Sequence, residues 1–273
     1  MDGPASGATS ADEQGATAGA SVAATDFGLK GPRGWAFRGI GVDAAAGSLI
    51  AVEGPSGSGR TCLLLALTGR MRPSEGTARV GGMRLPKQLT AVRRMSALAH
   101  VPGVTELDPA LTVAEHLREQ ALLQRRFDGT LRGLLRTPAE RRAEASLRID
   151  AALAAAGLDT ETLPKGSRTS VRDLERLEAL RLSLALALIA RPRLIGVDDT
   201  DLKLADAERA EIWAQLRAVA DAGTTVVAVC SEAPEGAVVV STAPVNTTND
   251  TAGGSADETA KETADALAEA RRA

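Results

Sequence analysis

Apolar and polar positions form two kinds of pattern in the middle of the chain. Short apolar runs bounded by turn residues predict strands within residues 48–53, 76–82, 95–101, 194–197 and 224–230. Longer patterns predict helices at residues 62–68, 112–160, 171–190 and 205–222. Because strands that are apolar throughout alternate with helices, we expect an α/β fold with a mostly parallel sheet covered on both faces.

Local signals mark both ends of one helix in the long helical region. Thr137 precedes Pro138, and a threonine cap before a proline at the first helical position predicts a helix start. The helix should continue over residues 139–156 and stop at Gly157, a residue that tolerates the left-handed backbone of a helix end. The sequence therefore predicts at least one well-defined helix here.

Composition shifts at both ends of the chain. Residues 1–24 are small and polar and bury too little apolar surface to order themselves, so we expect a disordered tail. Residues 241–273 begin as a polar linker and end in a stretch rich in Ala and Glu. There Arg271 and Arg272 suit the C-terminal end of a marginal helix. Residues 25–240 are left as the candidate folded domain.

Charge and composition exclude several classes of protein. The 32 basic and 35 acidic residues give a net charge of −3, so we expect no nucleic-acid partner. Cys62 and Cys230 lie in apolar runs and read as buried thiols, and two histidines are too few for a histidine-rich metal cluster. We find no apolar run long enough for a membrane span and no signal-peptide pattern, and we expect a cytoplasmic protein.

Residues 54–61 are the most informative stretch of the chain. They join a predicted strand to a predicted helix, and their three glycines let backbone N–H groups approach phosphate oxygens closely. The pattern is typical of a phosphate-binding loop, in which Thr61 offers its hydroxyl to Mg²⁺, and the alternative is a chance glycine turn. The candidate residues for nucleotide binding are Gly54, Pro55, Ser56, Gly57, Ser58, Gly59, Arg60, Thr61 and Cys62.

Arg60 is the one departure from the usual pattern of this loop, which has lysine at that position. The arginine keeps the positive charge, but its guanidinium is planar and forked, whereas a lysine ammonium is a compact point charge. We expect nucleotide binding to survive the exchange and the positioning of the terminal phosphate to suffer.

Two carboxylates follow the apolar strand of residues 194–197. Asp198 and Asp199 would lie at the C-terminal edge of the sheet, where α/β folds bind ligands. Asp198 is the candidate that holds Mg²⁺ together with Thr61, and Asp199 is the candidate that orients or deprotonates an attacking water. The alternative is a helix N-cap, with Asp199, Thr200 and Asp201 beginning the next helix.

In combination these segments resemble the nucleotide-binding subunit of ATP-binding cassette (ABC) transporters. The resemblance covers residues 25–240 and rests on residues 53–61, 100–103, 111–115, 190–199 and 224–231. It implies a P-loop NTPase (RecA-like) fold, with a helical subdomain at about residues 104–175 that docks on a membrane-spanning partner subunit. It also implies ATP and Mg²⁺ as ligands and a dimer, either of this chain with itself or with another ABC subunit.

The resemblance assigns roles to positions that this chain fills with other residues. Asp199 stands where the family has a catalytic glutamate, and Ser231 stands where it has a switch histidine, so both are candidate catalytic residues. Gly103 stands where a glutamine touches Mg²⁺ and water. Residues 175–177 stand where a serine-glycine-glycine signature lets a helix N-terminus approach the partner's nucleotide. Together with Arg60, these positions make five differences from the family, all at sites that would contact the nucleotide or the attacking water.

Three further features leave alternatives open. A capping-box pattern at Ser170 and Asp173 predicts that the helix at the signature position starts about one turn early. Trp35 is the nearest candidate for a ring that stacks on adenine, although a core or surface tryptophan is the alternative. A solvated helical face, or a contact with a membrane partner or anionic lipid, explains the basic residues Arg125, Arg126, Arg132, Arg136, Arg141 and Arg142.

Three functions are compatible with this pattern. The first is an ATP-binding subunit of an ABC-type membrane transport system that binds ATP and Mg²⁺ but hydrolyses ATP poorly, held by its partner at the inner face of the cell membrane. The second is a regulatory or scaffold protein with a vestigial nucleotide site. The third is one half of a heterodimeric ABC ATPase, in which the other chain supplies the intact signature.

Overall fold

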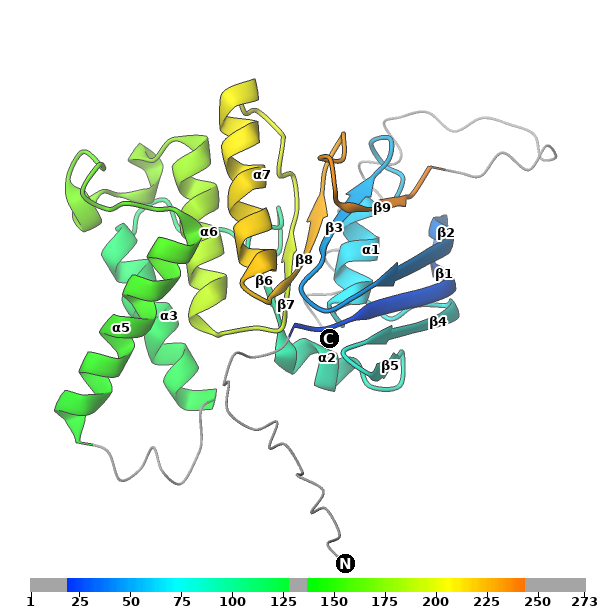
Figure 1. The fold of residues 1–273 in the computed structure, drawn as a ribbon, viewed down its shortest axis with the longest axis horizontal. Helices are drawn as coiled ribbons and strands as arrows, with labels where there is room; N and C mark the ends of the chain where they lie inside the picture. Colours follow the sequence, from blue (N-terminus) through cyan, green and yellow to red (C-terminus); the bar gives the residue numbers. More distant parts are fainter. Residues whose placement is uncertain (1–18, 128–136, 244–273) are drawn as a thin grey trace, which may run out of the picture.

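The computed structural model describes residues 19–127 and 137–243 (Figure 1). Its strands are β1 (Val22–Gly31), β2 (Gly34–Ala44), β3 (Leu49–Glu53), β4 (Glu75–Val80), β5 (Met83–Leu85), β6 (Ser96–Leu98), β7 (Leu194–Val197), β8 (Thr225–Val229) and β9 (Val238–Ser241). Its helices are α1 (Arg60–Leu67), α2 (Leu89–Met95), α3 (Val113–Phe127), α5 (Pro138–Ala156), α6 (Arg176–Ile189) and α7 (Asp206–Asp221).

Five strands form the expected parallel sheet; the apolar runs predict four of them, and β9 was missed. The strand order is β6-β7-β8-β3-β9, with β3 paired in parallel to both β8 and β9. Every residue of β7 and β8 is buried, as expected for strands covered on both faces. A second, antiparallel sheet has the order β2-β1-β4-β5 and comes from a region where the sequence predicts only one strand.

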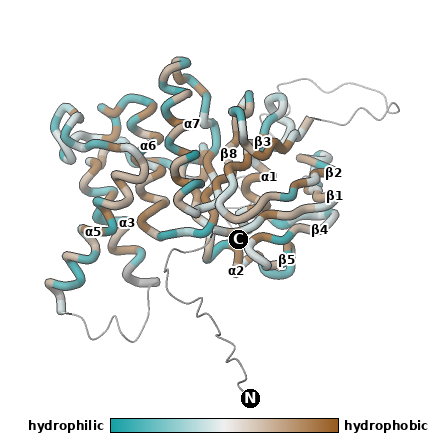
Figure 2. The backbone as a smooth tube through the Cα atoms, viewed as in Figure 1, coloured by the Kyte–Doolittle hydropathy of each residue, from teal (hydrophilic) through white to brown (hydrophobic). Residues whose placement is uncertain are grey.

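Helices cover the parallel sheet on both faces, with α1 on one side and α6 and α7 on the other (Figure 1). Helix α1 lies between the two sheets, where Leu63 and Ile50 share an apolar cluster with Phe27 of β1. On the opposite face, Leu184 of α6 and Ile212 of α7 pack over the sheet. Figure 2 shows the hydrophobic residues concentrated along the central strands and α1.

A helical unit stands beside the sheet, at the left of Figure 1. Helices α3 and α5 pack on α6, and Val113 and Leu117 share an apolar cluster with Leu182. Helix α6 therefore touches apolar neighbours on two sides, which explains why its sequence is apolar almost all round. Both predicted ends of α5 are confirmed, because Thr137 forms a capping box with Glu140 and the helix stops at a left-handed glycine.

The ordered fold extends beyond the boundaries predicted from composition. Ala20 and Val22 are fully buried, and β1 starts before residue 24 because Thr225 and Arg193 hydrogen-bond the backbone at Ala20. At the other end β9 continues to Ser241, and Thr242 is buried as well. Residues 1–18 and 244–273, with the expected C-terminal helix, lie outside the described residues.

Helix α6 starts later than the sequence predicts. Ser170 makes no side-chain cap, and residues Val171–Asp173 form only a short 3₁₀ turn. Backbone hydrogen bonds to Leu111 and Val113 hold this segment, so the helix cannot extend through it. Helix α6 begins at Arg176, and the predicted early start is wrong.

Candidate functional site

The glycine-rich loop connects the central strand β3 to helix α1. Gly59 precedes the first residue of α1 with φ +82°, and an added Cβ there would collide with the carbonyl oxygen of Ala36 on β2. Gly54 has φ +150°, and its Cβ would collide with the Thr242 hydroxyl. Both glycines are thus required by space as well as by backbone angle. The loop reaches the start of α1 in the form that phosphate-binding loops take.

The remaining loop residues divide into exposed and buried positions. Pro55, Ser56 and Gly57 are exposed, and Ser58 is half-buried with its hydroxyl 2.6 Å from that of Thr242. The side chain of Cys62 is buried in the core of α1, so this residue can offer only its backbone to a nucleotide.

Thr61 and Asp198 meet at the bottom of this loop. The Thr61 hydroxyl donates to Oδ2 of Asp198 over 2.6 Å, and Asp198 is only 2% exposed. Burial raises the pKa of Asp198 from about 3.8 to about 6, against the opposing hydrogen bond from Thr61, and the Asp199 charge raises the pKa further. The structure therefore brings together the two residues predicted to hold Mg²⁺.

Arg60 points its guanidinium toward the end of β8. Its Nη1 donates to the carbonyl oxygen of Cys230 over 2.6 Å. The Arg60 charge also acts on Asp198, where it is among the influences that lower the pKa while burial raises it. The cation that replaces the usual lysine thus lies between the ends of β7 and β8.

Asp199 follows Asp198 in a left-handed conformation with φ +49°. Its N–H donates to Oδ1 of Asp198 over 2.9 Å, and its carbonyl oxygen accepts from Nη2 of Arg176 over 3.4 Å. Aspartate tolerates this conformation better than most residues. Helix α7 begins only at Asp206, so the alternative that residues 199–201 begin this helix is wrong.

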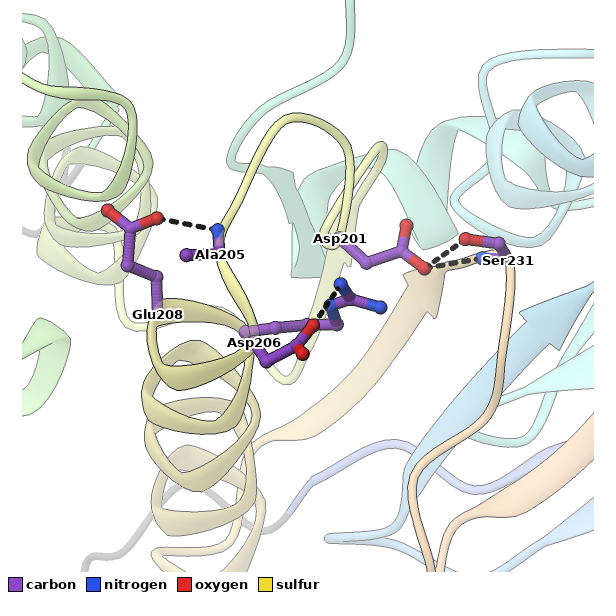
Figure 3. Close-up of polar contacts among 6 residues, drawn as sticks. Asp201, Ala205, Asp206, Glu208 and Ser231 are labelled. Atoms are coloured by element: carbon purple, nitrogen blue, oxygen red, sulfur yellow. Dashed lines mark hydrogen bonds and ion pairs between the residues drawn. The ribbon is translucent and has the colours of Figure 1, made fainter.

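Ser231 lies on the loop after β8 and contacts Asp201, which the sequence suggested only as part of a helix start. Its N–H donates to Oδ2 of Asp201 over 2.8 Å, and its hydroxyl donates to the same oxygen (Figure 3). Asp201 is on the loop after β7, which neighbours β8 in the sheet. A signal for this contact exists only in the strand order, because loops that follow adjacent parallel strands emerge at the same edge.

Two of the departures have a local structural reason. Gly103 has φ +74° in a tight turn, where its N–H donates to Glu106 over 2.9 Å, so a glutamine would be strained here. At the start of α6 the Glu178 side chain accepts a hydrogen bond from the Glu175 N–H over 2.8 Å, while Glu175 makes no side-chain cap. Two carboxylates of the same chain therefore lie at this helix start.

Trp35 lies on β2 beside Ala36, the residue that contacts Gly59. Trp35 is 40% exposed, and the Arg38 guanidinium lies 4.6 Å from its ring centroid. Arg38 is paired with Glu75, so the cation is held over the indole. These contacts favour the alternative of a surface tryptophan, because Arg38 would have to move before the ring could stack on adenine.

Little of the basic stretch can be placed. Arg132 and Arg136 lie outside the described residues, while Arg141 is half-buried and Arg142 exposed on α5. Within residues 19–127 and 137–243, no helix is long and apolar enough to cross a membrane.

Relatives of known name carry the same domain. One is the "Fe(3+) ions import ATP-binding protein FbpC" of Streptomyces avermitilis, 31% identical over 72% of this chain and 51% of its own length. Another is the "Cytochrome c biogenesis ATP-binding export protein CcmA" of Cupriavidus necator, 31% identical over 71% of this chain and 76% of its own. The chain spans only 18% of the similar ABC transporter A family members of Arabidopsis thaliana.

Solved structures share the fold. A dimeric ATP-binding cassette in a post-hydrolysis state, bound to ADP and Pi, aligns with 77% of this chain and 88% of its own at a TM-score of 0.59 and 21% identity. The cbiO1 protein of Clostridium perfringens aligns with 77% of this chain and 78% of its own, at a TM-score of 0.61 and 18% identity. The ABC transporter family matches residues 37–201, from β2 to the loop after β7, and the chain therefore belongs to the ABC transporter family.

Proposed function

We propose that this chain binds ATP with Mg²⁺ through residues 54–61 and Asp198, and that alone it hydrolyses ATP slowly. The observation that carries the proposal is the 2.6 Å contact between the Thr61 hydroxyl and the buried Asp198 carboxylate beneath the glycine-rich loop. A strand, a glycine loop and a helix N-terminus supply N–H groups to phosphates, and the hydroxyl and carboxylate supply oxygens to a cation.

Mg²⁺ fits the residues at this position. Thr61 and Asp198 offer oxygen donors only, which is the ligand type that Mg²⁺ prefers. The raised pKa of Asp198 shows that burial penalises its negative charge, and a cation at this carboxylate would offset that penalty. When bound, Mg²⁺ would neutralise charge on the terminal phosphates of ATP.

Slow hydrolysis follows from what surrounds the site. Asp199 carries a shorter side chain than glutamate for reaching a water, and Gly103 has no side chain to help. The Ser231 hydroxyl is already held by Asp201. Removing one group that stabilises a transition state costs on the order of 10²-fold in rate, although such losses do not add.

We propose a transport system at the membrane as the setting, with a membrane-spanning subunit as partner. Three large apolar side chains are exposed on the helical unit, at Leu122 and Leu123 of α3 and Leu147 of α5. An apolar surface of this kind suits a protein contact. The names of the relatives include an importer and an exporter, so they give this chain no direction of transport.

A heterodimer is the second candidate, and α6 is the observation that favours it. In a homodimer the α6 N-terminus of each copy would present the Glu175 carboxylate to the other copy's triphosphate, and like charges repel. A different subunit with small residues at that helix start would complete the loop at residues 54–61 without this repulsion.

Equilibrium binding of a fluorescent ATP analogue, with and without Mg²⁺, tests the proposal. We expect saturable binding that needs Mg²⁺ and that Thr61→Ala weakens at least tenfold. Thr77→Ala is the matched control, because Thr77 is exposed on β4 of the other sheet. Absence of saturable binding by the unsubstituted chain contradicts the proposal and favours a scaffold with a vestigial pocket.

A further inference from the structure

Hydrogen bonds join the loop after β7 to the chain at and just after the end of β8, at two points. The buried Thr200 donates its N–H and its hydroxyl to the Val229 carbonyl oxygen, over 3.2 and 2.8 Å. Two residues further along the chain, on the loop after β8, Ser231 donates its N–H and its hydroxyl to Oδ2 of Asp201. Figure 3 shows the second of these contacts, with Asp201 and Ser231 facing each other across the two loops.

Cys230 lies between Val229 and Ser231, the two residues that these hydrogen bonds hold. Its N–H donates to the Val52 carbonyl oxygen of β3 over 3.0 Å, and its own carbonyl oxygen accepts from Arg60. With residues 229 and 231 both held, the direction of the Cys230 carbonyl is fixed. The position of the Arg60 guanidinium is thereby connected, through two hydrogen bonds, to the carboxylate of Asp201.

The chemistry of arginine makes this connection useful. A guanidinium has five N–H donors in a rigid plane, so one donor held by a carbonyl leaves others for phosphate oxygens. Holding the group in place before the ligand arrives also removes part of the cost of immobilising a flexible side chain. A lysine ammonium at the same position lacks this planar fork.

We propose that Asp201 is a positioning residue for the cation of the phosphate loop. By holding Ser231, it fixes the Cys230 carbonyl that anchors Arg60 where the phosphates of the nucleotide bind. The proposal rests on the proposed function, since it assumes that residues 54–61 bind a triphosphate. It also gives Ser231 a role in holding Arg60 in place, in addition to the catalytic role that the resemblance implies.

A double-mutant cycle separates positioning from a merely structural role. We measure the Kd of a fluorescent ATP analogue with Mg²⁺ for the unsubstituted chain, Asp201→Ala, Arg60→Ala and the double variant. Asp201→Ala should weaken binding about fivefold when Arg60 is present and leave Kd unchanged when Arg60 is alanine. The matched control is Asp206→Ala, because Asp206 lies on α7 and pairs only with the nearby Arg209 among the described residues.

Two outcomes overturn the proposal. An equal loss of affinity from Asp201→Ala in both backgrounds shows that Asp201 acts through general stability and not through Arg60. Unchanged affinity in Asp201→Ala, as in Asp206→Ala, shows that the contact does not bear on the phosphate site.

Amide hydrogen exchange at Ser231 without nucleotide distinguishes these failures from failure of the proposed function. We expect faster exchange of the Ser231 N–H in Asp201→Ala than in the unsubstituted chain, with no change in Asp206→Ala. If the unsubstituted chain protects this N–H but binds no nucleotide, the proposed function fails and the Asp201 contact is structural alone. If Asp201→Ala leaves the exchange unchanged, the contact itself is wrong.

Discussion

The phosphate loop and the N-terminus of α6 are both helix starts that ABC proteins bring to a nucleotide, and in this chain they differ. At the phosphate loop, Gly59 lets the Ala36 carbonyl of β2 approach the start of α1, and Thr61 reaches a buried carboxylate. At α6, Glu178 accepts a hydrogen bond from the Glu175 N–H, and Glu175 places a second carboxylate at the helix start. The first helix start is suited to an anion, while the second carries negative charges that repel one.

This difference separates binding from turnover. The groups proposed to bind a triphosphate lie on α1 and on the loops that directly follow β3 and β7, two buried strands of the parallel sheet. The positions at which the family acts on the reacting atoms lie on loops and at the start of α6. In this chain Gly103, Ser231 and Glu175 fill them, and each makes a hydrogen bond to a neighbouring residue of the same chain. A fold of this kind can therefore retain nucleotide binding after it has lost groups that hydrolysis requires.

The largest effect is expected from filling the space at the phosphate loop. Gly59→Ala should lower the free energy of unfolding by about 3 kcal/mol and abolish nucleotide binding, because the new Cβ collides with the Ala36 carbonyl. Gly82→Ala is the control, since Gly82 has φ +83° with nothing within 4 Å, and it should cost only about 1 kcal/mol. Urea denaturation measures both, and equal losses would show that the loop is not confined by β2.

The second effect concerns the buried carboxylate and pH. The pKa of Asp198 is about 6 in the folded chain and about 3.8 as its ordinary value, so the folded state binds more protons between these values. In metal-free buffer this group should therefore add about 2 kcal/mol of stability as the pH falls from 7 to 4, and remove it again as the pH rises. Asp198→Asn should lack this contribution.

The unfolding free energies of both proteins at pH 7 and pH 4 supply the check. Only the difference between the two proteins is interpreted, because the other titrating groups are common to both. A difference that does not change with pH would contradict the burial of an ionisable Asp198. The same substitution should also remove the dependence of nucleotide binding on Mg²⁺.

A smaller effect should follow from removing the Glu175 carboxylate at the start of α6. Serine is a favourable N-cap and Glu175 makes no side-chain cap of its own, so Glu175→Ser should change the free energy of unfolding by less than about 0.5 kcal/mol. Nucleotide affinity should stay within twofold, since residue 175 serves the partner's site in this account. Sedimentation with ATP and Mg²⁺ should show more self-association than for the unsubstituted chain, because the repulsive carboxylate is gone. Equal association of the two proteins would remove the argument for a heterodimer.

The smallest effect is expected at Trp35. Because the Arg38 guanidinium lies over its ring and is held by Glu75, Trp35→Ala should change the affinity for ATP less than about twofold. A titration of ATP followed by calorimetry measures this change. A tenfold loss would mean that the ring stacks on adenine and that Arg38 moves away when the nucleotide binds.

The sequence predicted those features that depend on local pattern. The parallel strands are apolar throughout, and the Thr137 cap and the Gly157 stop are set by neighbouring residues, so all of these are confirmed. The pairing of Thr61 with Asp198 was expected from two motifs in a known order, and the structure brings them together.

Features that depend on distant contacts were missed or wrong. The early helix start predicted from the capping-box pattern at Ser170 is wrong, because backbone hydrogen bonds to residues 111–113 hold that segment out of the helix. The β1–β2 hairpin escaped notice because its glycines obscure the alternation of buried and exposed positions. Asp201 could not be linked to Ser231 without knowing that β7 and β8 are adjacent.

ATP hydrolysis by the purified chain at saturating ATP and Mg²⁺ tests the account most directly, once binding has been measured on the same sample. The account predicts saturable, Mg²⁺-dependent binding with a turnover below about 0.01 per second. A turnover above about 1 per second that Thr61→Ala abolishes and Thr77→Ala preserves would contradict it.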